Sequence, residues 1–231
     1  MPLRSTKVPH DAVHHPLFAR FYARMSVAAD TRGGIAAYRA ELLAGLSGRV
    51  IEIGAGNGLN FVHYPMAVSE VVALEPERTL RKLAAEAALH AEVPVDVVPG
   101  AAEALPVKSE AFDGAVASLV LCSVRDLPRA LSEIRRVLRP GGELRFFEHT
   151  LAKSPGLART QRVLDRTVWP LMCGGCHTAR DTIAAIEAAG FELGTHRRFR
   201  VPEGRVQLPT SPCVLGVARR PFGTDQGPAP W

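Results

Sequence analysis

Short apolar runs alternate with helical patterns along the middle of this chain. The runs are rich in β-branched residues and end at glycine, proline or a charged residue, which is typical of strands. They cover residues 49–56, 70–76, 93–100, 112–124 and 143–149. Between them, apolar positions recur at helical spacing over 79–91 and 127–142. This alternation predicts a parallel sheet with helices on both faces.

The flanking segments predict helices before this unit and a mixed pattern after it. Two helices are expected over 15–30 and 33–48, and the apolar stripe of the second is interpreted as core packing. After the fifth strand, the pattern predicts two more helices and then a hairpin of two closing strands, over 157–172, 179–191, 191–202 and 211–220.

Composition and charge narrow the class of protein. The chain has 231 residues, of which 47% are hydrophobic and 22% charged, and this balance predicts an ordinary globular domain. No apolar stretch reaches the roughly 18 residues of a membrane span, and the first residues lack the apolar centre of a secretion signal, so we expect a cytoplasmic protein. The net charge is +5, but no run of five basic residues occurs, so no nucleic-acid partner is predicted.

The first strand ends in a glycine-rich turn, and the second strand ends in an acid. Gly54, Gly56 and Gly58 allow positive φ and a close approach of a ligand to the backbone. Glu75 stands where an acid in this kind of fold accepts hydrogen bonds from a ribose diol. The glycine spacing departs from the dinucleotide pattern, and Glu52 would repel a pyrophosphate. The residues therefore favour a cationic nucleoside amino acid over a nicotinamide cofactor.

Five motifs extend this picture to a family resemblance. In order and spacing, the segments VIEIGAGNGLN, VVALEPE, VVPGAAEALP, FDGAVASLVLCSV and RRVLRPGGELRFFEH resemble class I S-adenosylmethionine-dependent methyltransferases over roughly residues 35–150. Within that superfamily the chain resembles thiol methyltransferases and, more distantly, quinone-biosynthesis C-methyltransferases. The resemblance implies an α/β, single-domain, Rossmann-like fold, with a mostly parallel seven-stranded sheet and an antiparallel last strand.

The same resemblance implies a division of the chain and a set of cofactor contacts. We expect a methyltransferase domain over 1–220, with a helical cap over 1–48, a lid-like insertion over 150–178 and a flexible tail over 221–231. The co-substrate S-adenosylmethionine is expected to contact residues of four segments: Glu52, Gly54, Ala55, Gly56, Gly58, Asn60, Glu75, Pro76, Ala101, Ala102, Ser118 and Leu119. Many relatives carry an aspartate at the position of Ala101. In this chain Glu103 is a candidate to substitute for that aspartate.

The residues on the acceptor side are fewer. His149 ends the fifth strand, at the edge where open α/β sheets bind ligands. Tyr22 belongs to the N-terminal helices, which roof the cofactor in this family. Cys176 and His177 belong to a Cys-x-x-Cys-His segment, which is similar to a stretch of the thiol methyltransferases. This segment offers three potential ligands where structural zinc takes four, so no metal is predicted.

These observations predict an enzyme that transfers a methyl group to a small, rather apolar acceptor. A thiol, a phenol or quinol, and an amine are the acceptor classes, in falling order. An acidic thiol or phenol needs no strong general base. Two alternatives stay open at this point, a nicotinamide-dependent oxidoreductase and a non-catalytic nucleoside-binding protein. The oligomeric state is not predicted.

Overall fold

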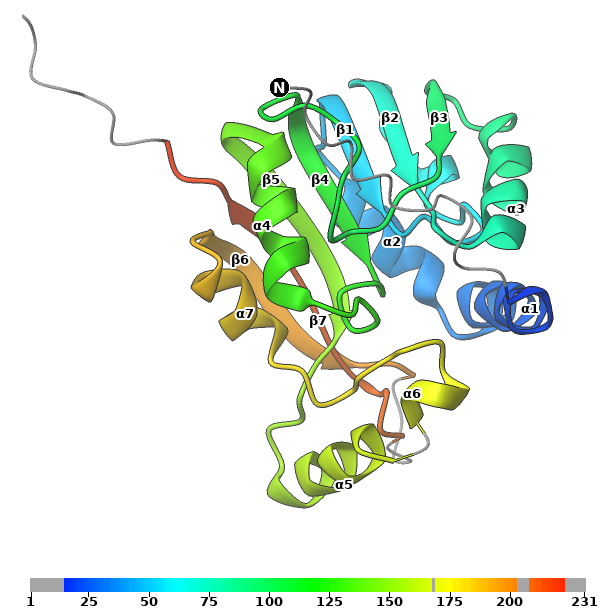
Figure 1. The fold of residues 1–231 in the computed structure, drawn as a ribbon, viewed down its shortest axis with the longest axis vertical. Helices are drawn as coiled ribbons and strands as arrows, with labels where there is room; N and C mark the ends of the chain where they lie inside the picture. Colours follow the sequence, from blue (N-terminus) through cyan, green and yellow to red (C-terminus); the bar gives the residue numbers. More distant parts are fainter. Residues whose placement is uncertain (1–14, 168, 203–207, 223–231) are drawn as a thin grey trace, which may run out of the picture.

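The computed structural model describes residues 15–167, 169–202 and 208–222, and its centre is one seven-stranded sheet (Figure 1). The strand order is β3-β2-β1-β4-β5-β7-β6. The first five strands are parallel, whereas β7 runs antiparallel to both β5 and β6. The strands are β1 (Gly48–Ile53), β2 (Val68–Leu74), β3 (Val95–Val98), β4 (Phe112–Ser118), β5 (Leu138–His149), β6 (Glu192–Arg200) and β7 (Pro212–Arg219). The predicted fold class is confirmed.

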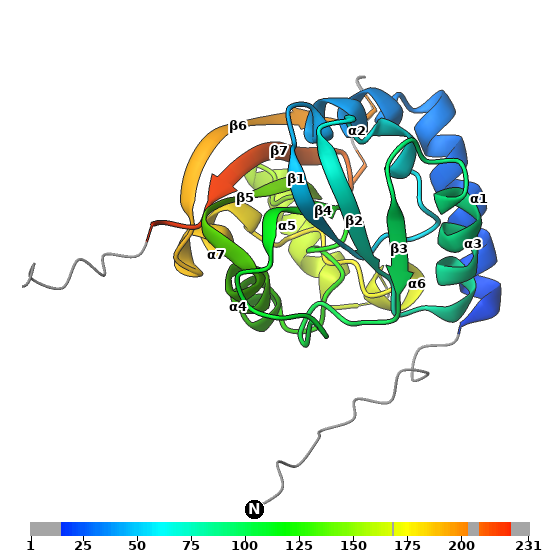
Figure 2. The ribbon, with the colours of Figure 1, turned by 90° about the horizontal axis from the view of Figure 1, so that it is seen from above.

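Helices cover both faces of this sheet. Figure 2 shows α4 and α7 on one side, α2 on the opposite side, and α1 and α3 alongside β3. The short α5 and α6 lie beyond the carboxyl ends of the central strands (Figure 1). The helices are α1 (Pro16–Arg32), α2 (Ile35–Leu43), η1 (Phe61–His63), α3 (Arg78–Ala88), α4 (Leu127–Val137), α5 (Pro155–Asp165), α6 (Trp169–Met172) and α7 (Thr182–Ala188).

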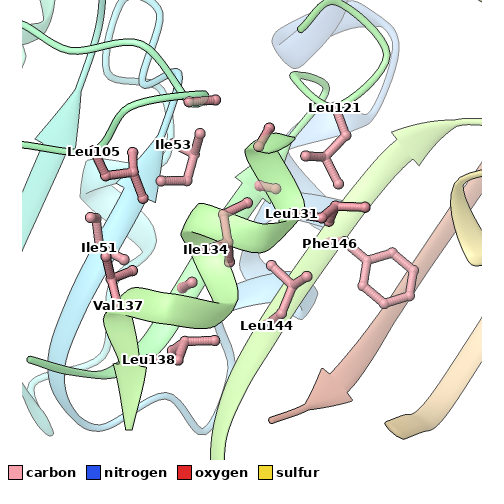
Figure 3. Packing of buried hydrophobic residues seen from close by; sticks show 14 of the residues in the cluster. Ile51, Ile53, Leu105, Leu121, Leu131, Ile134, Val137, Leu138, Leu144 and Phe146 are labelled. Carbon is pink, nitrogen blue, oxygen red and sulfur yellow. The ribbon is translucent and has the colours of Figure 1, made fainter. Parts of the chain in front are cut away.

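Each face of the sheet has its own apolar core. Under α4, three side chains at helical spacing, Leu131, Ile134 and Val137, pack on the strands and are fully buried (Figure 3). On the opposite face, Leu42 and Leu43 of α2 are buried, so the stripe of this helix packs in the core as predicted. The cores hold the central strands in place, and so they fix the loops at the strand ends.

Acidic side chains set where three helices begin. Glu77 Oε2 accepts a hydrogen bond of 2.7 Å from the amide of Leu80 and caps α3, and Asp126 Oδ1 caps α4 through the amide of Arg129 at 3.0 Å. Asp181 Oδ1 caps α7, at 3.4 Å from the amide nitrogen of Ala184. Each cap supplies an acceptor for an amide that the helix itself leaves without one.

Some boundaries differ from the sequence prediction. The fourth strand ends at Ser118, because Leu119 adopts a positive φ of 57° and turns the chain. Residues 157–172, predicted as one helix, belong to two helices, α5 and α6. Much of the apolar stripe of α1 faces outward, since Leu17 is 81% and Phe21 61% exposed. Among the described residues, no helix is both long and apolar enough to cross a membrane.

The strand order reverses beside β1. The chain leaves β1 for β2 on one side, and it later returns from β3 to β4 on the other. In open α/β sheets, ligands bind at this reversal, outside the carboxyl ends of the strands. The turns after β1, β2 and β4 therefore frame the candidate site.

Candidate active site at the carboxyl ends of β1, β2, β4 and β5

The glycines of the turn after β1 divide into two kinds. All three have positive φ: 65° at Gly54, 58° at Gly56 and 80° at Gly58. A Cβ at Gly54 would clash with Val120, and one at Gly58 would lie 2.8 Å from the Cβ of Ala87, so both positions are filled by the protein itself. A Cβ at Gly56 would meet only a ring carbon of Tyr22, at 3.8 Å. Gly56 is thus the one of these three glycines beside which a Cβ would fit, in ordinary contact with the Tyr22 ring.

Glu75 ties this turn to the end of β2. Its Oε2 accepts a hydrogen bond of 2.8 Å from the amide of Gly56, and its Oε1 accepts one of 2.9 Å from the amide of Glu77. The side chain is buried, and this burial raises the pKa of Glu75 to about 7, against the hydrogen bonds that lower it. Each oxygen keeps a lone pair for a further donor.

A second buried carboxyl lies within β1. Glu52 accepts hydrogen bonds from Asn60 Nδ2 at 2.8 Å and from the Tyr64 hydroxyl at 2.7 Å. Burial raises its pKa to about 7. Arg39 of α2 extends the network, since its Nη1 donates to Asn60 Oδ1 at 2.8 Å and to Ser118 Oγ at 3.1 Å. The network joins the ends of β1 and β4.

A third buried carboxyl organises the turn after β4. Glu148 of β5 accepts hydrogen bonds from the amides of Val120, Leu121 and Cys122, at 2.9, 2.8 and 3.2 Å. Leu119, at the start of this turn, donates its amide to the carbonyl of Phe147 at 2.7 Å. Burial raises the pKa of Glu148 to about 7.

The three carboxyls give the site its electrostatic character. Glu52, Glu75 and Glu148 come from three different strand ends, and each has a pKa of about 7. Among the described residues, Arg39 is the only basic one whose side chain is buried. When the carboxyls ionise, the site carries an excess of negative charge, and this field favours a cationic ligand.

Tyr22 of α1 lies over this arrangement. Burial raises the pKa of its hydroxyl to about 12, and the charges of Arg39, Glu75 and Glu148 all act on it. Its ring faces Gly56 and stacks on Phe18, with 6.0 Å between the ring centroids. The structure thus brings Tyr22 to the predicted cofactor residues.

The other candidate acceptor-side residues have partners of their own. His149 Nδ1 lies 3.6 Å from the Cys213 sulfur, and burial lowers the pKa of His149 to about 4. His177 Nδ1 lies 3.7 Å from Asp165 Oδ2. The thiols of Cys176 and Cys122 shift each other's pKa, lowering that of Cys176 and raising that of Cys122. The structure does not bring the two histidines together with Tyr22.

Further predicted cofactor residues follow β2 and β3. Pro76 comes directly after Glu75, and its carbonyl accepts a hydrogen bond of 3.0 Å from Arg81. Ala101 forms an isolated bridge with Ala104, and Ala102 is buried. Glu103 accepts hydrogen bonds from the amides of Arg125 and Asp126, so its carboxylate holds the start of α4. Ala55 is buried, and its amide donates to the carbonyl of Leu74 at 2.9 Å.

Sequence reasoning did not identify Arg39, Tyr64 and Glu148. A signal existed for Glu148, because it is an acid that directly follows two phenylalanines and precedes a histidine at the predicted strand end. Arg39 and Tyr64 carry no such signal, since each is distant in sequence from the residues that it contacts in space.

Comparison with known proteins identifies the family of this chain. A family model described as a methyltransferase domain matches residues 51–146. Mouse Thiol S-methyltransferase TMT1B is 36% identical over 182 residues, which are 76% of this chain and 73% of the mouse protein. A Ubiquinone/menaquinone biosynthesis C-methyltransferase UbiE from Syntrophotalea carbinolica is 31% identical over 196 residues, 78% of this chain and 81% of that protein.

A solved structure shows the same fold. It is described as a possible histamine N-methyltransferase from Thermotoga maritima, and it superposes with a TM-score of 0.63 at 23% identity, covering 88% of this chain and 98% of that one. The chain belongs to the class I S-adenosylmethionine-dependent methyltransferases. It is an enzyme that uses S-adenosylmethionine as co-substrate, which decides against the nicotinamide and non-catalytic alternatives.

Proposed function

We propose that the protein methylates a small, rather apolar thiol. Phenols or quinols, and then amines, follow as acceptor classes. The relatives support this order, since one is named a thiol S-methyltransferase and another a quinone-biosynthesis C-methyltransferase. The observation that carries the proposal is that the possible bases around Tyr22 already have partners. Among the described side chains, Glu52, Glu75 and Glu148 accept hydrogen bonds from the protein, and the ring of His149 lies against the Cys213 sulfur.

The proposal assigns S-adenosylmethionine to the space beside Gly56. In this assignment Glu75 accepts from the ribose hydroxyls, and its two backbone hydrogen bonds hold it in place for that role. The adenine lies beside Pro76, Ala101 and Ala102. The acidic field of the three carboxyls suits both the ammonium and the sulfonium of the ligand.

The acid–base properties of the site favour a thiol. Tyr22, with a pKa of about 12, is protonated at neutral pH and is a poor base. His149 is unprotonated, but its ring is engaged with Cys213. A free thiol has a pKa of about 8.5 and is a few per cent thiolate at pH 7, which is enough for a strong nucleophile. Alcohols and ammonium groups instead need a base to remove a proton.

The reaction itself neutralises charge. S-adenosylmethionine supplies a methyl group that its sulfonium already activates. A thiolate sulfur lone pair forms the new carbon–sulfur bond as the old one breaks, and the products are a neutral thioether and neutral S-adenosylhomocysteine. Because charge is lost on the way to the transition state, a site that excludes water accelerates the step.

The cap and the lid supply this exclusion in our proposal, over residues 1–48 and 150–178. A Cβ at Gly174, just after α6, would clash with the ring of Phe18 in α1, so the two segments are in contact. Residues 1–14 and most of the predicted tail lie outside the described residues. The four free cysteines agree with a cytoplasmic location, which we also propose.

The pH dependence of turnover tests the proposal. We expect S-methylation of small thiols, with kcat/KM rising about tenfold per pH unit up to the pKa of the thiol. Acceptors of lower thiol pKa shift the plateau to lower pH. Tyr22→Phe keeps this profile, since no proton passes to its hydroxyl. The proposal is wrong if thiols are not methylated while a quinol or amine is, or if Tyr22→Phe abolishes the pH dependence.

A further inference from the structure

Two buried cysteines from distant parts of the chain meet beside the site. Cys122 lies on the turn after β4, and Cys176 lies on the segment between α6 and α7. They are 1% and 8% exposed, and each thiol shifts the pKa of the other. The proposed methyl transfer uses neither of them.

The backbone holds the two segments together. The amide of His177 donates to the carbonyl of Cys122 at 2.8 Å. Arg180 donates to the carbonyls of Leu121 and Val124, at 2.5 and 2.7 Å. Standard bond lengths then limit the distance between the Cα atoms of Cys122 and Cys176 to roughly 7.6 Å at most. Disulfides need about 4.4–6.8 Å, so this spacing demands little movement.

The two thiols differ in acidity. The neighbouring Cys122 thiol lowers the pKa of Cys176, against the effect of burial, and the indole of Trp169 lowers it further. The Cys176 thiol, together with burial, raises the pKa of Cys122. Cys176 is therefore the nucleophilic partner, and Cys122 the one that keeps its proton.

We propose that Cys122 and Cys176 form a reversible disulfide that locks the segment carrying α6 onto the turn after β4. Hydrogen peroxide is the oxidant. The Cys176 thiolate attacks one peroxide oxygen, the O–O bond breaks, and hydroxide leaves and takes up a proton to become water, which gives a sulfenic acid. The Cys122 thiol then displaces the hydroxyl group from the Cys176 sulfur, which forms the S–S bond and releases a second water.

The position of this disulfide gives it a consequence for the enzyme. The turn that carries Cys122 is held by Glu148, and the segment that carries Cys176 belongs to the predicted lid. Motions of such lids admit acceptor and release product. We therefore expect the oxidised enzyme to turn over about tenfold more slowly and dithiothreitol to restore the rate. This expectation rests on the proposed function.

Peptide mapping of the peroxide-treated full chain tests the disulfide directly, without reference to activity. We expect one linked peptide pair, containing Cys122 and Cys176, which disappears after reduction. Because the bond closes a loop of roughly 55 residues, Tm should rise by about 5–10 °C on oxidation and return with dithiothreitol. Cys213→Ser is the matched control, since it removes another buried cysteine, and it should behave like the wild type.

Three outcomes decide the matter. A Cys173–Cys176 bridge overturns the pairing, as does peroxide oxidation of Cys176 only to sulfinic acid. Peroxide sensitivity that persists in Cys122→Ser and Cys176→Ser overturns the proposed control of turnover. If the linked peptide forms but no thiol is ever methylated, the disulfide stands and the proposed acceptor fails, so the two proposals are tested separately.

Discussion

The exchange of Glu75 for glutamine tests the ribose contact at almost constant size. In the wild type, the two carboxylate oxygens accept the amides of Gly56 and Glu77, at 2.8 and 2.9 Å, and each has one lone pair left for a hydroxyl. The amide group of glutamine keeps one acceptor oxygen. Its NH₂ group only donates, so it faces a backbone N–H without forming a hydrogen bond and offers no acceptor to the ribose.

The expected loss follows from these contacts. A hydrogen bond to a charged group contributes about 1.5–3 kcal/mol, so Glu75→Gln should weaken binding of S-adenosylhomocysteine by roughly 10- to 150-fold. Glu75→Ala removes both acceptors and should lie at the upper end of this range or beyond it. The measurement is isothermal titration calorimetry at pH 8, where the wild-type carboxyl, with a pKa of about 7, is mostly ionised.

A matched control separates this contact from general effects on the strand. Glu70, also on β2, has a half-exposed side chain and forms an ion pair with Arg49. Glu70→Gln should leave the affinity within about twofold of the wild type, since an exposed pair contributes little. Wild-type affinity in a folded Glu75→Gln variant would refute the assignment of the ribose to Glu75.

Three further predictions concern the same site. Gly56→Ala should fold and lose affinity for S-adenosylhomocysteine, whereas Gly54→Ala should lower Tm because its Cβ clashes with Val120. Equal changes of affinity and of Tm in the two variants would contradict the different roles given to these glycines. Without ligand, stability should fall as pH rises from about 4.5 to 7, since each raised carboxyl pKa disfavours the folded state there by up to about 3 kcal/mol. In urea titrations, Glu148→Gln should reduce the fall of the free energy of unfolding with pH. An unchanged fall would count against a raised pKa of Glu148. The affinity for S-adenosylmethionine relative to S-adenosylhomocysteine should rise by roughly 3- to 10-fold from pH 6 to 8, as the carboxyls ionise around the sulfonium; a constant ratio would argue against this field.

Local patterns were sufficient to predict the fold and part of the site. The alternation of strands and helices is local, and Gly54, Gly56, Gly58 and Glu75 occupy the turns that the pattern predicted. The network of Glu52 was predicted only in part, because Arg39 reaches it from a helix that contributes no motif. Such contacts depend on how α2 packs on the sheet, which periodicity does not specify.

The two histidines show a second limit of sequence reasoning. His149 stands at the predicted strand end, but its ring lies against Cys213 of β7, a neighbour fixed only by the antiparallel pairing of β5 with β7. His177 lies near Asp165 because the connection after β5 breaks into two short helices. A position at the correct end of a strand does not determine which way the side chain points.

A crystal structure with S-adenosylhomocysteine tests the central claim most directly. The account predicts density in the space beside Gly56, with both ribose hydroxyls on the carboxylate of Glu75 and the sulfur facing the side of the site that Tyr22 covers. Ligand density at any other place, with Gly56 and Glu75 uncontacted, would contradict it.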